Sequence, residues 1–303
     1  MTFHKKSRLG FIGAGVVGGS LAVALSNAGY TVSSVASRSF GSARLFASRL
    51  PRCEAFSRAQ EVVDIADFVF ITTPDDAIRP VCDSLSWRLG QGLAHCSGVA
   101  SVDLLRYATD QGAEVGAFHP MQALNSVDNG VAAIPGTTFG IEGDEFIRAY
   151  LAEMATAIGG KPTSLRPEDK VLYHVSGVLM GGLLSGLGCV AASLWEKFGH
   201  TRDDGVRALA PMMRAVAANL EASGVPHALQ GPIPRGDIGT IRNHLDAVSA
   251  DAPEYLPLYR ELALASIPFA VEKGALGPAR AAEIGELVGR YAAEDKVRAG
   301  DGE

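Results

Sequence analysis

Short apolar runs alternate with segments of helical composition through the first half of the chain. The first run, residues 9–12, leads through a glycine-rich turn into residues 20–28, which have helical composition. Further strands are expected at residues 31–36, 53–56, 68–72, 92–96 and 114–118, with helical segments between them. A strand, a helix and a strand at residues 137–141, 145–158 and 162–165 close the pattern. This alternation predicts an α/β domain with a mostly parallel sheet.

The pattern becomes helical after Arg166 and Pro167. Candidate helices cover residues 168–198, 204–222, 238–248, 255–273 and 279–297, and glycine and proline separate them. At about 150 residues for each domain, a chain of 303 residues is long enough for two. We therefore expect an α/β domain over residues 1–165 and an all-α domain over residues 166–303.

A glycine-rich turn joins the first expected strand to the first expected helix. In such a turn Gly13 makes the bend, Gly15 lets the backbone approach a pyrophosphate, and Gly18 allows close contact between helix and strand. The amide groups at the start of the helix then face the anion. Its position between a strand and a helix predicts a Rossmann-type dinucleotide site formed by Gly13, Ala14, Gly15, Val16, Val17 and Gly18.

The end of the second expected strand indicates which dinucleotide is preferred. An enzyme that uses NAD carries an acidic residue there, but this chain has no Asp or Glu before Glu54. Ser37 and Arg38 offer instead a hydroxyl and a guanidinium that suit a 2′-phosphate, and Arg44 follows in the next helix. These residues favour NADP(H) over NAD(H). The alternative for Arg38 and Arg44 is that they are solvated surface arginines.

Polar residues follow the later strands at the edge where open α/β sheets bind their ligands. Thr73 and Pro74 are expected beside the nicotinamide half of the cofactor. Ser97, His119 and Gln122 are expected to line the substrate side, with Ser97 and His119 in catalysis. Each is also a residue type that commonly ends a strand or caps a turn, and this alternative stays open.

The long apolar helix begins with two polar side chains on one face, Lys170 and His174, which are four residues apart. Reduction of a carbonyl or an imine needs a proton donor near the developing charge, and either side chain can supply it near neutral pH. The pattern does not decide which of the two does so. The alternatives are a solvent-exposed lysine and a buried, hydrogen-bonded histidine.

Residues 231–237 interrupt the helical half with two prolines and two glycines around a single arginine. We expect a stiff loop in which Arg235 binds an anionic group of the substrate. Asp237 is expected beside the substrate as well, and it can cap the helix that follows.

Composition narrows the class of protein. The net charge of −6 is spread without long blocks of like charge, which argues against a nucleic-acid partner and for a small-molecule substrate. The four cysteines form no Cys-x-x-Cys pair and no zinc pattern, so we expect no metal site. They are interpreted as reduced, mostly buried thiols, which favours the cytoplasm.

Two uncharged stretches allow a membrane alternative. Residues 9–37 follow a basic segment, as in a signal peptide, but the five glycines from Gly10 to Gly19 fit a strand, a turn and a helix better. Residues 171–195 are long enough to span a bilayer. Their glycines also suit a helix packed tightly inside a protein, and His174 would be costly in lipid. We therefore expect no membrane partner.

The combined motifs resemble the β-hydroxyacid dehydrogenase and 6-phosphogluconate dehydrogenase superfamily, in which a Rossmann domain precedes an all-helical domain. Within it, the chain is most similar to Rossmann-like reductases with a C-terminal domain of unknown function, relatives of ketopantoate and pyrroline-5-carboxylate reductases. The motifs are residues 73–78, 95–98 with 118–122, and 170–174 with 231–237.

The resemblance also implies roles for particular residues. In the superfamily a helical Lys, followed four residues later by Asn, serves catalysis, and here Lys170 and His174 have that spacing. Many nearer relatives carry an Asn eight residues after the His, where this chain has Gly182. The resemblance further implies a homodimer through the helical domain.

Together these patterns predict an NADPH-dependent oxidoreductase that reduces a small carbonyl or imine. The substrate would be a 2-oxo acid such as ketopantoate, or a cyclic imine. The competing hypothesis is an NADP(H)-binding sensor whose catalysis is weak or lost.

Overall fold

The computed structural model describes residues 3–300, with side chains up to residue 292, so the outermost residues of both expected domains lie outside it. The chain divides into two compact units, residues up to Leu184 and residues from Ser185 onward. This division falls later than the boundary expected after residue 165, because the start of the long helix packs on the sheet through Lys170 and Tyr173.

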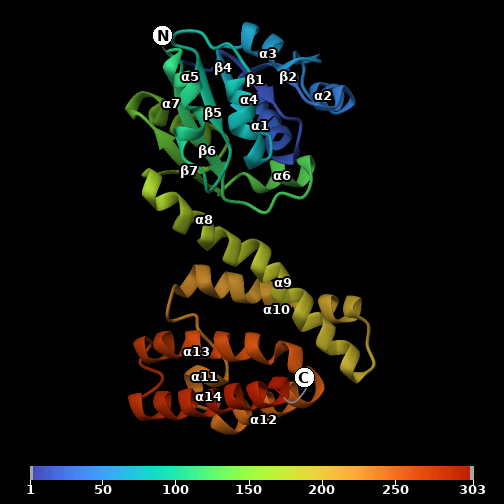
Figure 1. The fold of residues 1–303 in the computed structure, drawn as a ribbon, viewed down its shortest axis with the longest axis vertical. Helices are drawn as coiled ribbons and strands as arrows, with labels where there is room; N and C mark the ends of the chain where they lie inside the picture. Colours follow the sequence, from blue (N-terminus) through green and yellow to red (C-terminus); the bar gives the residue numbers. More distant parts are fainter. Residues whose placement is uncertain (1–2, 301–303) are drawn as a thin grey trace. The chain divides into compact units, whose positions relative to one another are not determined.

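An eight-stranded sheet forms the centre of the first unit, in the order β3-β2-β1-β4-β5-β6-β7-β8 (Figure 1). All neighbouring strands are parallel except the antiparallel pair β6–β7. The mostly parallel α/β class is therefore confirmed. The strands are β1 (Arg8–Ile12), β2 (Thr31–Ala36), β3 (Glu54–Phe56), β4 (Phe68–Ile71), β5 (Gly92–His95), β6 (Glu114–Pro120), β7 (Thr138–Gly143) and β8 (Lys161–Ser164).

Helices cover both faces of this sheet and bury two separate apolar cores. On one face lie α1 (Val16–Asn27), α2 (Phe40–Ala47) and α7 (Glu145–Ala157), over stacked rings such as Phe118 and Phe139, whose centroids are 4.6 Å apart. The other face is covered by α3 (Ala59–Ile65), α4 (Asp75–Asp83) and the short helices η1 (Val102–Leu105) and α5 (Arg106–Asp110). Helix α6 (Val127–Ala133) packs on α1, where Gly19 and Gly130 remove the side chains that would clash. The sheet is thus a rigid base for its loops.

The helical half begins with the long helix, which comprises η2 (Pro167–Asp169), α8 (Lys170–Val178), a π-helical turn, η3 (Leu179–Leu183), α9 (Leu184–Ser193) and η4 (Leu194–Phe198). The second unit buries its own apolar core between four of its helices and their connections. Its remaining elements are α10 (Arg202–Ser223), α11 (Pro232–Arg235), α12 (Ile238–Asp251), η5 (Pro253–Tyr255), α13 (Leu256–Glu272) and α14 (Pro278–Gly300). The expected all-helical second half after β8 is therefore confirmed.

Three local expectations are wrong. Residues 232–235 form the short helix α11 rather than a loop, because proline is well tolerated in the first turn of a helix. His119 lies inside β6, which continues to Pro120, rather than after it. Of the four cysteines only Cys82 is buried, whereas Cys189 is exposed.

The long helix is far more exposed than its glycines suggested. Its most apolar window is only 6% buried, and Gly181, Gly182, Gly186 and Gly188 each face open space where a Cβ would stand. The expectation that these glycines pack tightly inside the chain is wrong for a single copy. By length and composition alone, the helix over residues 167–198, with a mean hydropathy of 1.8, is apolar enough to cross a membrane.

Candidate active site

The glycine turn has the geometry that its sequence predicts. Gly13 has a φ of +111°, and a Cβ there would lie 2.7 Å from the backbone of Thr72. A Cβ on Gly18 would lie 2.4 Å from Thr72 Oγ1, which itself donates a hydrogen bond of 2.9 Å to the Gly13 carbonyl. Gly15, by contrast, faces open space. Two glycines are therefore required by packing, and the third keeps a path to the backbone clear.

Helix α1 begins directly at this open position. Gly15 is its N-cap and provides no side-chain hydrogen bond, and the first turn contains no acidic residue. The first N–H groups of a helix have no partner within the helix, so the amides of Val16, Val17 and Gly18 are available to an anion. Together with the helix dipole they make this end of α1 suitable for a phosphate.

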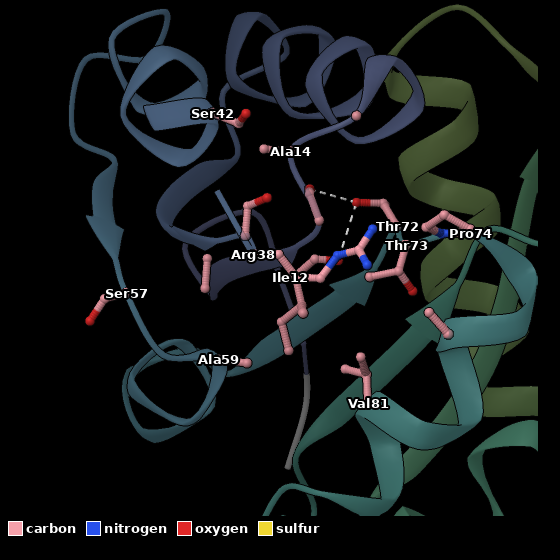
Figure 2. A pocket seen from close by; sticks show the side chains of 15 residues that line it. Ile12, Ala14, Arg38, Ser42, Ser57, Ala59, Thr72, Thr73, Pro74 and Val81 are labelled. Carbon is pink, nitrogen blue, oxygen red and sulfur yellow. Dashed lines mark hydrogen bonds between the residues drawn. The ribbon is translucent and has the colours of Figure 1, made fainter. Parts of the chain in front are cut away.

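A cavity of about 420 Å³ is lined in part by residues of this turn. Figure 2 shows the side chains that line it. Its wall includes Ala14, Ser37 and Arg38, and the Arg38 side chain points into it. Two hydroxyls that sequence analysis missed, from Ser42 and Ser57, also line it. Arg44 lies exposed on α2 and is not part of this lining.

The far end of this cavity is formed by Thr73 and Pro74, at the start of α4. Thr73 Oγ1 is buried and has no hydrogen-bond partner within the described part of the chain. Burying a hydroxyl without a hydrogen-bond partner costs about 1–3 kcal/mol, so a ligand that forms a hydrogen bond with Thr73 Oγ1 is favoured here. The open Gly15, the free amides and this hydroxyl together fit a dinucleotide.

A second cavity of about 540 Å³ lies in the same unit. It brings together His119 and Gln122, which the sequence predicted for the substrate side, and His174, one of the two predicted proton donors. The Gln122 amide donates to Thr137 Oγ1 at 3.2 Å, which holds it in place. The π-helical turn supplies part of the wall, and the remaining lining residues are Met121, Ala123, Ser176, Gly177, Val178, Met180, Gly181 and Gly182.

The loop after β5 connects the two cavities. Ser97 is buried, donates a 2.7 Å hydrogen bond to Asp75 at the start of α4, and accepts one from the Ala100 amide. The next residue, Gly98, fits against both histidines: a Cβ there would lie 2.7 Å from His119 Nε2 and 2.5 Å from His174 Cδ2. Asp75 was missed as a site residue, although it follows the expected Thr73 and Pro74 directly.

His119 is held by aromatic neighbours. Its Nδ1 lies 3.2 Å from the Tyr173 hydroxyl, and its ring meets those of Tyr173 and His174 edge to face, at 5.6 and 5.8 Å between centroids. Burial, followed by the nearby His174 and Lys170, lowers the pKa of His119 to about 4. His119 is therefore neutral near pH 7.

Lys170 is neither in solvent nor part of the second cavity's wall. It is 1% exposed, and its Nζ lies 3.3 Å from Glu142 Oε2 and 3.5 Å from the Ser97 carbonyl. Burial lowers its pKa, while Glu142 acts in the opposite direction. Glu142 Oε1 also accepts the Val102 amide, so this ion pair ties β7, the loop after β5 and α8 together. Sequence analysis missed Glu142.

A second buried histidine, His95, supports the same loop. Its Nδ1 accepts the Ser97 amide at 3.2 Å, and its Nε2 lies 3.1 Å from the Ser101 carbonyl. Burial lowers its pKa to about 4, which keeps it neutral and able to accept. His95 therefore positions Ser97.

Arg235 and Asp237 lie in the second unit. Asp237 caps α12 by accepting the Thr240 amide at 3.1 Å, as expected. Arg235 is exposed at the end of α11. Its role toward a substrate stays a prediction.

Comparison with known families agrees with the fold. One family model, the Rossmann-like domain, matches residues 3–120, and a second, a domain of unknown function called DUF2520, matches residues 137–266. The first half of the chain thus matches a Rossmann-like domain. The chain as a whole combines a Rossmann-like domain with a DUF2520 domain, which confirms the resemblance derived from the motifs.

Solved structures share this architecture over most of their length. A candidate NADP oxidoreductase of Bacteroides fragilis is 23% identical with a TM-score of 0.68, over 86% of this chain and 98% of its own. An Aspergillus terreus reductive aminase in complex with NADPH is 17% identical, with a TM-score of 0.59 over 95% and 94%. The 1-pyrroline-5-carboxylate reductase of Streptococcus pyogenes is 16% identical, with a TM-score of 0.57 over 96% and 100%. At these identities the likeness shows the fold, and no curated protein matches the chain.

The buried ion pair yields a stability prediction. Lys170→Met leaves the Glu142 carboxylate buried without its partner, so we expect the free energy of unfolding to fall by about 3–5 kcal/mol in urea denaturation. The double variant Lys170→Met with Glu142→Gln should recover at least half of this loss, because glutamine can still accept the Val102 amide. Arg49→Met, which breaks the exposed pair with Asp128, is the control and should cost about 1 kcal/mol or less. A Lys170→Met cost as small as that of the control would contradict this interpretation.

Proposed function

We propose that the chain is an NADPH-dependent oxidoreductase that reduces a small carbonyl or imine compound. One observation carries the proposal: the cavity beside the glycine turn and the cavity with two histidines are linked by the Asp75–Ser97 hydrogen bond and by Gly98. A nucleotide and a small substrate held in these cavities would meet at this loop.

NADP(H) is the proposed cofactor. Gly13, Gly15 and the first amides of α1 would hold its pyrophosphate, and Arg38 with Ser42 and Ser57 would bind the 2′-phosphate. Reductive aminases of Aspergillus terreus, which share this fold, have been solved in complex with NADPH, and this supports the choice. When bound, the cofactor supplies the hydride that a reduction requires.

The chain's own residues would do the remaining work. We assign proton donation to His174, because it lines the cavity, whereas the Lys170 ammonium is held by Glu142. Ser97 would orient the site through Asp75, and His119 and Gln122 would contact the substrate. Arg235, supported by the helix that Asp237 caps, is proposed to bind an anionic group.

We further propose that residues 166–303 form a homodimer. Apolar side chains stand exposed along α8 and the π turn, including Leu172 at 76% and Leu183 at 58%. A stripe of this kind needs a cover, and a second copy offers the same apolar face by symmetry. With this face covered, we place the protein in the cytoplasm. Its proposed partners are a small-molecule substrate and a second copy of the chain, with no nucleic acid and no membrane.

The choice of cofactor can be tested on Arg38. We expect Arg38→Ala to weaken NADPH binding about 10- to 100-fold, the value of a charge-assisted hydrogen bond, and to leave NADH binding within about twofold. Fluorescence titration with each cofactor measures both constants. Arg44→Ala is the matched control and should change little, since Arg44 is outside the cavity lining. Equal losses for NADPH and NADH in Arg38→Ala would rule out a contact with the 2′-phosphate.

Catalysis is tested by NADPH oxidation with a panel of 2-oxo acids and cyclic imines. On the best 2-oxo acid, His174→Ala should lower kcat about 10²- to 10⁴-fold and keep the NADPH dissociation constant. Arg235→Ala should raise KM for 2-oxo acids only. Tight NADPH binding without turnover of any compound would favour the sensor hypothesis, and an unchanged kcat in His174→Ala would exclude the proton-donor role.

The homodimer is tested by sedimentation of the full chain. We expect a dimer for the wild type and a monomer for Leu172→Glu or Leu183→Glu, because a buried carboxylate in an apolar interface is unfavourable. Leu89→Glu alters a leucine that is 83% exposed elsewhere in the first unit, and this control should stay dimeric. A monomeric wild type that floats with lipid vesicles would show that the stripe meets a membrane instead.

A further inference from the structure

The Tyr173 hydroxyl makes two contacts with one residue. It lies 3.2 Å from His119 Nδ1 and 3.4 Å from the His119 carbonyl oxygen. Burial raises the pKa of Tyr173 to about 12, so the hydroxyl keeps its single proton near pH 7. One hydroxyl proton can serve only one of these two acceptors fully.

This count favours one histidine tautomer. If the hydroxyl donates to the carbonyl oxygen, its own oxygen is free to accept, and the second contact becomes a hydrogen bond only when His119 Nδ1 carries the proton. In the opposite tautomer, with the proton on Nε2, the hydroxyl would donate its proton to Nδ1, and the carbonyl oxygen would receive no hydrogen bond from it. The pattern that satisfies both contacts leaves His119 Nε2 as a lone-pair acceptor.

The acceptor nitrogen is free to meet a ligand. Within residues 3–292 His119 Nε2 makes no hydrogen bond to the protein, and it stands beside Gly98, which has no side chain to cover it. The residue lines the second cavity next to His174. The charged or titratable groups around the ring are Tyr173, His174 and Lys170 on α8, Asp75 on α4 and His95 on β5. Burial, His174 and Lys170 all lower the pKa of His119 and outweigh Asp75, which raises it, so the ring stays neutral.

We propose that Tyr173 is a positioning residue that holds His119 Nε2 as an acceptor, and that the site thereby selects a protonated imine. This rests on the proposed reductase function and narrows its substrate class. A carbonyl oxygen presents only lone pairs to Nε2, which is unfavourable, whereas the N–H of an iminium ion donates to it. In the reduction, hydride adds to the carbon, the C=N π pair moves to nitrogen, and a neutral amine results that keeps its N–H. A protonated imine therefore needs no proton from His174, which the proposed function requires only for neutral carbonyl substrates.

The tautomer can be measured without any substrate or cofactor. In long-range ¹H–¹⁵N spectra of the labelled chain, which has seven histidines, His119 is assigned by the signal lost in His119→Gln. We expect a neutral ring with the proton on Nδ1, unchanged from pH 8 to about pH 5 because its pKa is about 4. In Tyr173→Phe the second tautomer should become populated. A proton on Nε2, or a charged ring at pH 7, would overturn the assignment.

Selectivity is measured with three probes of similar shape: 1-pyrroline, the N-methyl-1-pyrrolinium ion and cyclopentanone. We expect kcat/KM for 1-pyrroline to exceed that for the N-methyl ion by about 10- to 100-fold, the value of a hydrogen bond to a charged group, with cyclopentanone reduced more slowly still. His119→Ala should bring the ratio of the two imine probes close to one. His119→Gln should restore part of it, because its side-chain oxygen can accept near the Nε2 position.

The outcomes distinguish a failure of the imine selectivity from a failure of the reductase function. An unchanged probe ratio in His119→Ala, or faster reduction of cyclopentanone than of 1-pyrroline, overturns the imine selectivity and leaves the reductase function standing. Failure to reduce any probe or any compound of the wider panel, although NADPH binds, removes the reductase function and the selectivity with it. The spectra still decide the tautomer in that case.

Discussion

The buried ion pair between Lys170 and Glu142 is the constraint on which the site depends. It joins the first turn of α8 to strand β7, and through the Ser97 carbonyl and the Val102 amide it also holds the loop after β5. Two charges removed from water are tolerated only when geometry and hydrogen bonds compensate, so the pair permits few alternative arrangements. His174 stands one turn further along the same helix, and its position beside Gly98 follows from this link.

The rest of the site follows from the sheet. Parallel strands place their carboxyl ends at one edge, and β1, β4 and β5 each lead into a loop that lines or joins the cavities. Backbone must come close to backbone there, which is why Gly13 and Gly18 cannot carry side chains. The loop after β5 has the same requirement at Gly98, where the small residue leaves room for two imidazole rings.

Sequence pattern predicted the features that depend on local order. The periodicity of apolar residues and the spacing of glycines indicate the strands, the helices and the turn at Gly13. The preference for NADP(H) also depends only on neighbouring positions, because it rests on Arg38 and on the lack of an acidic residue near it. The partnership of Glu142 with Lys170 could not be read in this way, because it depends on where β7 and α8 meet after folding. Similarly, no local signal shows that the Tyr173 hydroxyl on α8 reaches His119 on β6.

The long helix shows why a sequence can suggest burial and yet leave open what provides it. Its glycines and leucines predict close packing, but in one copy of the chain nearly all of its most apolar window is exposed. Each fully buried leucine contributes about 1.5–3 kcal/mol, so leaving Leu172, Leu179 and Leu183 in water forgoes a large part of the helix's stabilisation. Because Met180 and Gly182 on the same helix form the wall of the second cavity, whatever covers this stripe also restricts water near the histidines. In the proposed dimer, assembly and catalysis are therefore coupled through one helix.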